Sequence, residues 1–163
     1  MARLLIVYHS ATGGARQMAA AALEGALAED GVASRMLHAG LAGPADVLGA
    51  DGYLFAAPEN LGSLAGVMKD FFDRCYYPVL GRAEGRPYAV MVCAGSDGQG
   101  AVRQVARIAT GWRLRAVAAP LVVCTGAQSE AAIMARKVIG GEDLGRCREL
   151  GAGLAAGLAL GVF

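Results

Sequence analysis

The chain alternates short apolar runs with longer segments in which apolar residues recur every three or four positions. Continuous apolar runs of this kind are typical of strands that are buried on both faces of a parallel sheet. A less apolar segment, at 34–38, has the length of a short strand. We therefore predict five strands, over residues 4–8, 34–38, 53–57, 88–93 and 116–123.

The segments between these runs have helical spacing. In 15–30, for example, Met18, Ala22, Leu23 and Leu27 recur on one helical face before Gly31 ends the pattern. Five alternations of strand and helix indicate a doubly wound parallel α/β sheet with right-handed crossovers. The further predicted helices are a weak one in 39–50, 64–77 (ended by Pro78), 101–110, one capped by Ser129, and 142–160.

Composition narrows the classes of protein that fit this pattern. The 163 residues are expected to form one domain, 1–163, and a hydrophobic content of 55% excludes disorder. A net charge of +1 gives no electrostatic reason to expect nucleic acid or an anionic membrane as a partner. The four cysteines have no CxxC spacing and the two histidines form no HExxH motif, so we predict no metal site.

The two ends of the chain bear on where it is expected to work. The N-terminus enters an apolar strand pattern at once and does not have the shape of a signal peptide. The longest apolar run, 150–163, is too short for a bilayer and is interrupted by four glycines. We expect a reduced, cytoplasmic protein.

Small polar side chains gather at one rim of the predicted sheet. In an open α/β sheet, ligands bind beyond the carboxyl ends of the strands. The loops at that rim are 9–16, 58–63, 94–100 and 124–128. The chain has only eight Ser and Thr residues and one Asn, and these loops hold Ser10, Thr12, Asn60, Ser63, Ser96 and Thr125. Because loops favour such residues anyway, the choice of one rim is the informative part, and it favours a ligand site there.

The first loop carries the most specific signal. Ser10 and Thr12 offer hydroxyl groups, and the glycines that follow allow a close approach of the backbone. The loop leads into the N-terminus of a helix, where free N–H groups attract a phosphate. Arg16 suits either a phosphate partner or an exposed side chain. The absence of GxxxxGK[ST] excludes a P-loop NTPase.

At this point the residues resemble a known family. Tyr8-His9-Ser10-Ala11-Thr12-Gly13-Gly14 resembles the FMN-phosphate loop of the flavodoxin fold. The stretch 51–63, followed by 65–74, is similar to the second flavin-binding segment of flavodoxin-fold NAD(P)H-dependent FMN and quinone reductases. The resemblance covers nearly the whole chain. It implies a three-layer flavodoxin-like fold with a five-stranded parallel sheet in the order 2-1-3-4-5.

The resemblance also implies roles for individual residues. By position, the first loop holds the phosphate, 58–63 lie along the isoalloxazine ring, and 94–100 reach its pyrimidine and ribityl side. Threonine is common in the family where Ala15 stands, so one hydroxyl donor is missing. The expected cofactor-binding residues are Ser10, Thr12, Gly13, Gly14, Ala15, Arg16, Pro58, Glu59, Asn60, Leu61, Gly62, Ser63, Ala94, Gly95, Ser96, Gly98 and Gly100.

The activity implied by the resemblance is that of an FMN-binding oxidoreductase. It passes a hydride from NAD(P)H, through the flavin, to a quinone or other small acceptor, and it needs no catalytic side chain. Carrier flavodoxins are strongly acidic and usually stack aromatic rings on the flavin, whereas this chain is neutral and has no aromatic residue in 58–63 or 94–100. The rival function is a non-enzymatic electron carrier or flavin-binding protein. A receiver-type signalling domain is disfavoured, because His9 ends the first strand where an acidic Mg²⁺ cluster is needed.

Several other residues allow two interpretations. Glu59 and Asp97 fit either a ligand contact or a solvated loop, and His9 fits a site role or, more simply, a packed strand end. Cys93 and Cys124 end neighbouring strands, and two buried thiols are favoured over a redox pair. Trp112 is expected at the opposite rim, and the tail glycines in tight helix packing. The aromatic residues Phe71, Phe72, Tyr76 and Tyr77 are predicted as core first and as the face of a homo-oligomer second.

Overall fold

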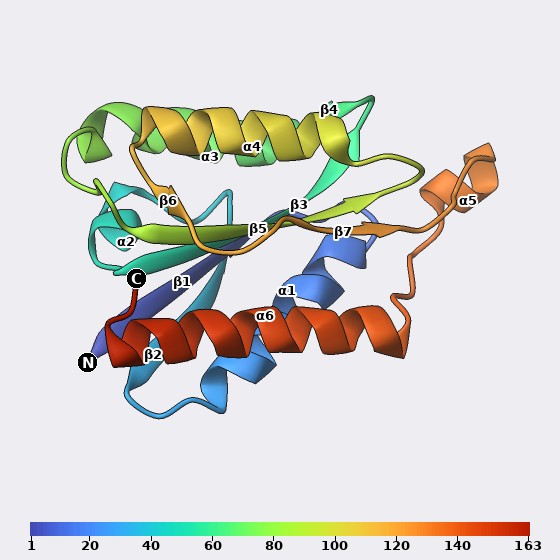
Figure 1. The fold of residues 1–163 in the computed structure, drawn as a ribbon. Coiled ribbons are helices and arrows are strands. Elements are labelled where there is room, and N and C mark those ends of the chain that lie inside the picture. Colours follow the sequence, from blue (N-terminus) through green and yellow to red (C-terminus); the bar gives the residue numbers. More distant parts are fainter.

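The computed structural model describes residues 1–163 and is built around a parallel sheet with the strand order β2-β1-β3-β5-β6 (Figure 1). The predicted order is confirmed, but the fifth strand is split into β6 and β7, which both pair with β5. Pro120 precedes β7 and has no N–H to give to the ladder, which accounts for the break. The strands are β1 (Ala2–Tyr8), β2 (Val32–His38), β3 (Gly52–Asn60), β5 (Pro87–Ala94), β6 (Arg115–Ala116) and β7 (Leu121–Cys124).

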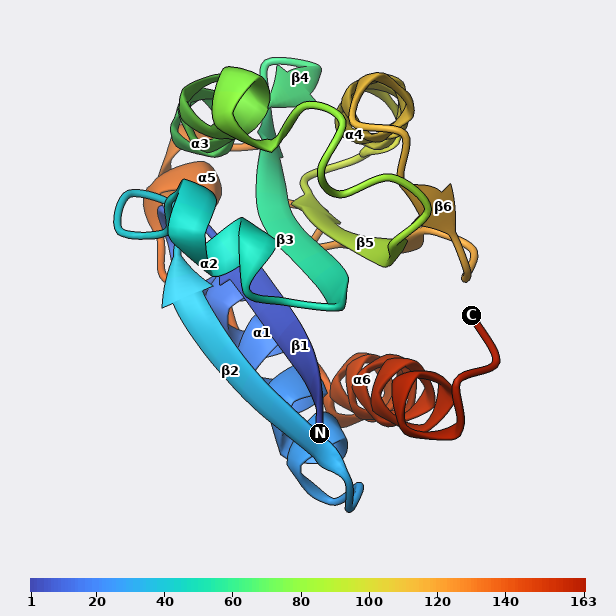
Figure 2. The same ribbon diagram turned by 90° about the vertical axis from the view of Figure 1, so that its left-hand side faces the viewer.

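Helices cover both faces of the sheet and complete three layers (Figures 1 and 2). One buried cluster lies between the sheet and α1 and α6, and the other lies under α2, α3 and α4. The apolar strands are buried on both faces because each supplies side chains to both clusters, as Leu4 and Leu5 of β1 do. The helices are α1 (Gly14–Leu27), α2 (Pro44–Leu48), α3 (Gly66–Val79), α4 (Gln99–Gly111), α5 (Glu130–Met134) and α6 (Gly141–Leu160).

Three predicted boundaries are wrong. Pro78 lies inside the last turn of α3, and the helix continues to Val79 although Pro78 has no N–H to donate. The predicted loop 58–63 is instead a hairpin, because β3 runs on to Asn60 and pairs with the short antiparallel strand β4 (Ser63–Leu64). Helix α4 begins at Gln99, two residues earlier than predicted, at the positive-φ residue Gly98.

The aromatic residues of α3 separate into two groups. Phe71 and Phe72 are fully buried and pack around Phe55 and Trp112. Tyr77 is exposed and Tyr76 is partly exposed, so the prediction that all four aromatic residues belong to the core is wrong. Trp112 caps the C-terminus of α4, at the rim opposite the carboxyl ends of the strands, as expected.

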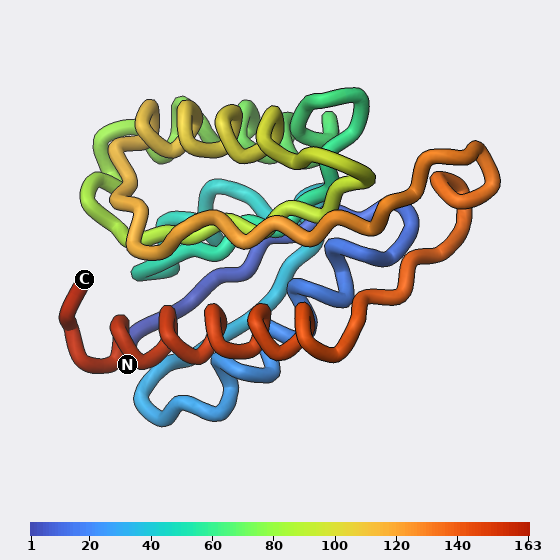
Figure 3. Tube along the Cα trace, turned by 45° about the vertical axis from the view of Figure 1, so that its right-hand side comes forward, coloured from blue at the N-terminus to red at the C-terminus, as the bar shows by residue number.

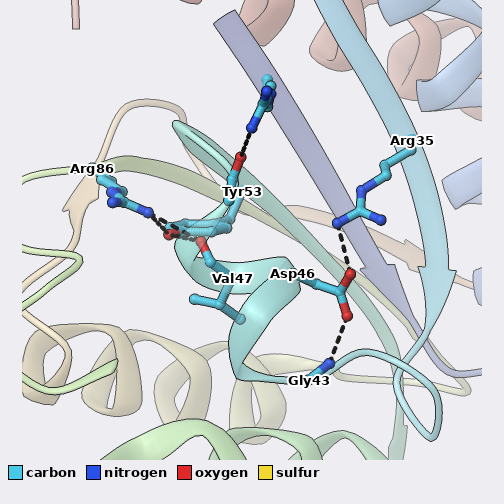
Figure 4. Close-up of polar contacts among 8 residues, drawn as sticks. Arg35, Gly43, Asp46, Val47, Tyr53 and Arg86 are labelled. Carbon is cyan, nitrogen blue, oxygen red and sulfur yellow. Dashed lines mark hydrogen bonds and ion pairs between the residues drawn. The ribbon is translucent and has the colours of Figure 1, made fainter. Parts of the chain in front are cut away.

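Polar contacts hold α2 at that opposite rim (Figure 4). The Asp46 carboxylate accepts hydrogen bonds from the Gly43 N–H at 2.9 Å and from the Arg35 guanidinium at 2.7 Å. Arg86 donates to the Val47 carbonyl at 3.0 Å and to the Tyr53 hydroxyl at 3.0 Å. These bonds satisfy backbone groups at the ends of a five-residue helix that is too short to be stable alone.

None of the helices is both long enough and apolar enough to cross a membrane.

Helices α1 and α6 touch backbone to backbone. A Cβ added at Gly151 would lie 1.9 Å from the Ala22 carbonyl oxygen, and one at Gly25 would lie 2.0 Å from the Arg148 carbonyl oxygen. These distances are far below van der Waals contact, so only glycine allows the two helices to approach this closely. Among the tail glycines, Gly151 therefore serves helix packing, as expected, whereas Gly153 and Gly161 have no atom near their Cβ positions.

We predict that Gly151→Ala destabilises the protein by about 1–3 kcal/mol, because the added methyl group overpacks the contact between α1 and α6. Gly153→Ala is the matched control. Gly153 lies in the same helix with no atom near its Cβ position, so this change should stabilise the protein by about 0.5–1 kcal/mol. Urea unfolding measures both, and equal effects would contradict the packing account.

Candidate functional site

Two cavities adjoin at the carboxyl ends of the strands. The central cavity, about 390 Å³, lies between the first loop, the β3–β4 hairpin and the ends of β5 and β7. The outer cavity, about 590 Å³, lies along the flank of α1, and Thr12 lines both. The central cavity is lined by Thr12, Pro58, Glu59, Asn60, Leu61, Cys93, Ala94, Gly95, Thr125, Ala127, Ile133 and Lys137.

The first loop presents backbone N–H groups that have no acceptor within the protein. Its turn is closed by a hydrogen bond of 3.0 Å from the Gly13 N–H to the Ser10 Oγ, and Gly13 has a φ of 95° that favours glycine. The N–H groups of Ala11, Thr12, Gly14 and Ala15 donate to no protein atom. Buried N–H groups without partners are rare, and Gly14 and Ala15 are both buried. Donors of this kind can bind the acceptor oxygens of a bound group.

Gly14 fixes the position of this turn on the sheet. A Cβ at Gly14 would lie 2.5 Å from the Cys93 Sγ, so the start of α1 rests directly on β5. Burial raises the pKa of the Cys93 thiol, which therefore stays protonated at neutral pH. Cys93 acts here as a small packing residue and not as a nucleophile.

The segment that contains α5 forms the third wall of the site, and sequence reasoning missed it. It projects past the end of the sheet and returns beside the turn that follows β1 (Figure 3). The Lys137 N–H donates to the Thr12 carbonyl at 2.8 Å. The Gln17 side chain binds this segment twice, by donating to the Lys137 carbonyl at 2.7 Å and accepting from the Ile139 N–H at 3.0 Å.

These contacts bring two cations, Arg136 and Lys137, to the first loop. The Arg136 side chain lies 3.7 Å from the Cβ position of Gly13. Lys137 lines the central cavity, and its ammonium donates to the carbonyls of Ile133 and Ala135 at the end of α5. In the sequence, the only signal for this role is that the two basic residues Arg136 and Lys137 are adjacent.

The β3–β4 hairpin carries a strained residue at its tip. Leu61 and Gly62 have φ values of 53° and 70°, the pattern of a two-residue type I′ turn. Leucine is unusual at such a position, and the Leu61 side chain is fully exposed beside the central cavity. Strain of this kind is concentrated at functional sites. The hairpin thus holds an apolar side chain out at the mouth of the cavity.

Glu59 lines the cavity, but its carboxylate is committed elsewhere. It accepts from the Gly98 N–H at 2.9 Å and from the Ala101 N–H at 3.1 Å, and so caps the N-terminus of α4. A Cβ at Gly100 would lie 1.8 Å from the Gly62 carbonyl oxygen. Both interpretations offered for Glu59 are therefore incomplete, since its main role is to fasten the hairpin to α4. Gly100 is needed for this packing, whereas Gly98 is needed for its φ of 88° and for its close approach to Val122 of β7.

The expected site residues divide into three sets. Seven line the central cavity: Thr12, Pro58, Glu59, Asn60, Leu61, Ala94 and Gly95. Gly13 and Arg16 join Thr12 in the outer cavity. The other eight line neither cavity: Ser10, Gly14 and Ala15 belong to the first turn, and Gly62, Ser63, Ser96, Gly98 and Gly100 belong to the hairpin and to the loop and helix start after β5. No aromatic ring lines the central cavity.

The cysteine pair is excluded by geometry. In the ladder, Cys93 aligns with Val123, and Ala94 aligns with Cys124. Paired residues share a face and successive residues alternate, so the two thiols point to opposite faces of the sheet. Cys124 is also exposed, which makes the prediction of two buried thiols wrong for that residue.

His9 is half-buried at the start of the loop and pairs with His38. The His9 Nδ1 and His38 Nε2 lie 3.2 Å apart, and the Gly40 N–H donates to the His38 Nδ1 at 3.0 Å. Because the Gly40 bond makes the His38 Nδ1 an acceptor, the neutral His38 carries its proton on Nε2 and donates to His9. Burial and the neighbouring His38 lower the pKa of His9 below its ordinary value of 6.5.

We predict that this histidine pair makes stability fall in mild acid. The pKa of His9 is lower in the folded chain, so the unfolded chain binds more protons as the pH drops below about 6.5. The free energy of unfolding should decrease from there down through the lowered pKa of folded His9. In His9→Asn, whose Oδ1 can replace the acceptor, this slope should be shallower. Urea unfolding across pH gives the slopes, and identical slopes would refute the role of His9.

Comparison with known proteins is consistent with this geometry. A flavodoxin from Aquifex aeolicus (strain VF5) is 33% identical over 100 residues, which is 61% of this chain and 54% of that protein. An NAD(P)H dehydrogenase (quinone) from Acidithiobacillus ferrooxidans (strain ATCC 53993 / BNL-5-31) is 31% identical over 45% of this chain and 47% of its own length. The matched region thus spans about half the length of these curated relatives.

Solved structures extend the likeness of fold to the whole chain. A flavodoxin from the domain Archaea superposes with a TM-score of 0.77 and 16% sequence identity, over 96% of this chain and 98% of that one. At this identity the match shows the fold alone, and it confirms the expected flavodoxin-like architecture.

The family assignment comes from the sequence. The model of the family described as NADPH-dependent FMN reductase matches residues 44–129, which is 86 of the 163 residues. This match agrees with the expectation of FMN as cofactor and NAD(P)H as electron donor. We conclude that the chain belongs to the NADPH-dependent FMN reductase family.

Proposed function

We propose that this chain is an FMN-binding oxidoreductase that takes a hydride from NAD(P)H and passes the electrons to a small acceptor such as a quinone. The observation that carries this proposal is the set of unpaired N–H groups at Ala11, Thr12, Gly14 and Ala15, next to a cavity between three strand ends. A phosphate oxygen accepts such hydrogen bonds, and the N-terminus of α1 favours its negative charge.

The residues present fit FMN in both of its parts. The first turn offers donors for the phosphate, and Thr12, whose side chain carries a hydroxyl group, lines both cavities. The central cavity, about 390 Å³, falls in the range of cofactor sites and is walled by backbone and small side chains. When bound, FMN supplies the ring that accepts a hydride and releases the electrons to an acceptor.

In this proposal, the residues around the cavity bind and orient the flavin and do not transfer protons. The thiol of Cys93 is protonated and buried, and the carboxylate of Glu59 is occupied by two N–H groups of α4. Hydride transfer depends on stacking of the nicotinamide on the flavin at about 3–3.5 Å, and it depends less on an acid or base of the protein. The clamp between Glu59 and α4 would hold the hairpin steady beside the ring, and Leu61 would limit access at the mouth.

The absence of aromatic rings in the cavity wall favours the enzyme over a carrier. A ring bound there would keep one face open, and a nicotinamide and then an acceptor could occupy that face in turn. A flavodoxin-type electron carrier is the second candidate, and the likeness to the Aquifex aeolicus flavodoxin favours it. The net charge of +1 counts against it, because the chain lacks the strong net negative charge that steers carrier flavodoxins to their redox partners.

The experiment that tests the proposal is an FMN titration followed by steady-state oxidation of NADH and NADPH with a quinone acceptor. Turnover by the FMN-loaded protein supports the oxidoreductase. FMN binding without turnover with any of several acceptors supports the carrier. A protein that does not bind FMN would refute both candidates.

We predict that Thr12→Val weakens FMN binding by about 10- to 100-fold, the value of one hydrogen bond to a charged group. Riboflavin, which has no phosphate, should bind the variant and the parent protein equally. Thr110→Val is the matched control, since the Thr110 hydroxyl bonds to the Ala106 carbonyl on α4, away from the site. Fluorescence titration measures the affinity of the parent protein and of both variants for each flavin. If Thr12→Val weakened riboflavin binding as much as FMN binding, Thr12 would not contact the phosphate.

A further inference from the structure

Two exposed apolar residues line the central cavity from different walls. Leu61 lies at the tip of the β3–β4 hairpin, and Ile133 lies on α5. The hairpin and α5 are both at the end of the sheet where the site lies (Figure 1). Leu61 is fully exposed and Ile133 is 52% exposed, and neither belongs to a core cluster. Their apolar side chains are therefore free to contact a molecule that enters the cavity.

The backbone conformation of Leu61 costs stability. Its φ of 53° lies in the left-handed region, which residues other than glycine and asparagine adopt at a cost. A type I′ turn favours asparagine before its glycine, and Gly62 is the glycine of this turn. Since leucine neither packs against the protein nor suits the turn, it contributes nothing favourable to folding here. A strained residue beside a cavity points instead to a contact with a bound molecule.

Polar bonds, and not apolar packing, hold Ile133 in place. Helix α5 has five residues, and none of them is buried. Ser129 caps the N-terminus of α5 by accepting a hydrogen bond of 3.2 Å from the Ala132 N–H. At the other end, the Lys137 ammonium donates to the carbonyls of Ile133 and Ala135 at 2.8 and 2.6 Å. The helix thus presents an apolar side chain to the cavity without having a core of its own.

The central cavity offers no free charge to a bound molecule. Its only charged lining residues are Glu59 and Lys137. The Glu59 carboxylate accepts from two N–H groups of α4, and the Lys137 ammonium donates to two carbonyls of α5. A charge buried without a partner is costly, whereas apolar surface gains from leaving water. The cavity therefore favours an uncharged molecule that carries apolar groups.

We propose that Leu61 and Ile133 select the electron acceptor, by contacting the apolar substituents of an uncharged, ring-shaped acceptor from two sides. The inference rests on the proposed function and deepens it, since it names the selecting residues and the chemical class that they select. A ring-substituted quinone belongs to this class. It takes up two electrons as a hydride and one proton from solvent and leaves as the hydroquinone, while NAD(P)H becomes NAD(P)⁺. Both residues determine specificity and neither is catalytic.

The test measures the Kd of tetramethyl-1,4-benzoquinone for the oxidised, FMN-loaded protein without NAD(P)H, from changes in the flavin absorption spectrum. This quinone is fully substituted, so it does not alkylate the exposed Cys124. Leu61→Asn and Ile133→Ala should each raise the Kd about 5- to 10-fold, the effect of one lost apolar contact. Leu41→Asn and Met134→Ala are the matched controls, because both residues are exposed and neither lines the central cavity.

Two further measurements separate this role from a structural one. Leu61→Asn relieves backbone strain, so its urea midpoint should rise by about 0.3–0.6 M while quinone binding weakens. In turnover with NADPH, the KM for the quinone should rise about 5- to 10-fold in each of the two cavity variants. The KM for ferricyanide, a charged acceptor without apolar groups, should change by less than about twofold.

Each of the other outcomes counts against the inference. An unchanged quinone Kd in both cavity variants overturns it, as does an equal rise in the controls or a parent protein that does not bind the quinone. A rise in the Kd for FMN that equals the rise for the quinone assigns the two side chains to the flavin and also overturns it. The proposed function is refuted separately, by a protein that binds no FMN or by an FMN-loaded protein that oxidises NADPH with neither acceptor, since the quinone Kd does not depend on NADPH.

Discussion

The site depends on backbone N–H groups that the fold leaves without acceptors at the start of α1. Two long-range contacts keep them in place. Gly14 rests on the thiol of Cys93, and the Thr12 carbonyl, which would otherwise accept a helical hydrogen bond, is taken by the Lys137 N–H at 2.8 Å. A turn fixed in this way would not need to reorganise to bind the proposed phosphate, because folding has already ordered its donors.

Long-range contacts also fix the rest of the rim, and they are made by groups that hold the cavity walls together. The carboxylate of Glu59 and the close contact of Gly100 with Gly62 fasten the hairpin to α4, and Gln17 fastens the α5 segment to α1. Each wall of the cavity is therefore fastened to a neighbouring helix or strand. What remains free at the mouth is the side chain of Leu61 and the cations of the outer cavity.

The sequence alone predicts most of the fold and about half of this rim, for physical reasons. Apolar runs reveal buried strands, and a Ser-x-Thr-Gly-Gly turn before a helix reveals phosphate donors, because both signals are local. The α5 wall was missed because its attachment joins Gln17 to Lys137, 120 positions apart. The role of Glu59 likewise depends on a helix 39 residues later. Pro78 and Tyr77 were misjudged because tolerance of proline and exposure both depend on what packs against the end of α3.

We infer that the free N–H groups of the first turn bind the phosphate of FMN. Amide ¹H–¹⁵N spectra of the protein with FMN and with riboflavin are the sharpest test of this inference. The Gly14 and Ala15 amide protons should shift downfield with FMN but not with riboflavin, because only FMN brings the acceptor oxygens. Amide resonances at these two positions that respond equally to both flavins, or to neither, would contradict it.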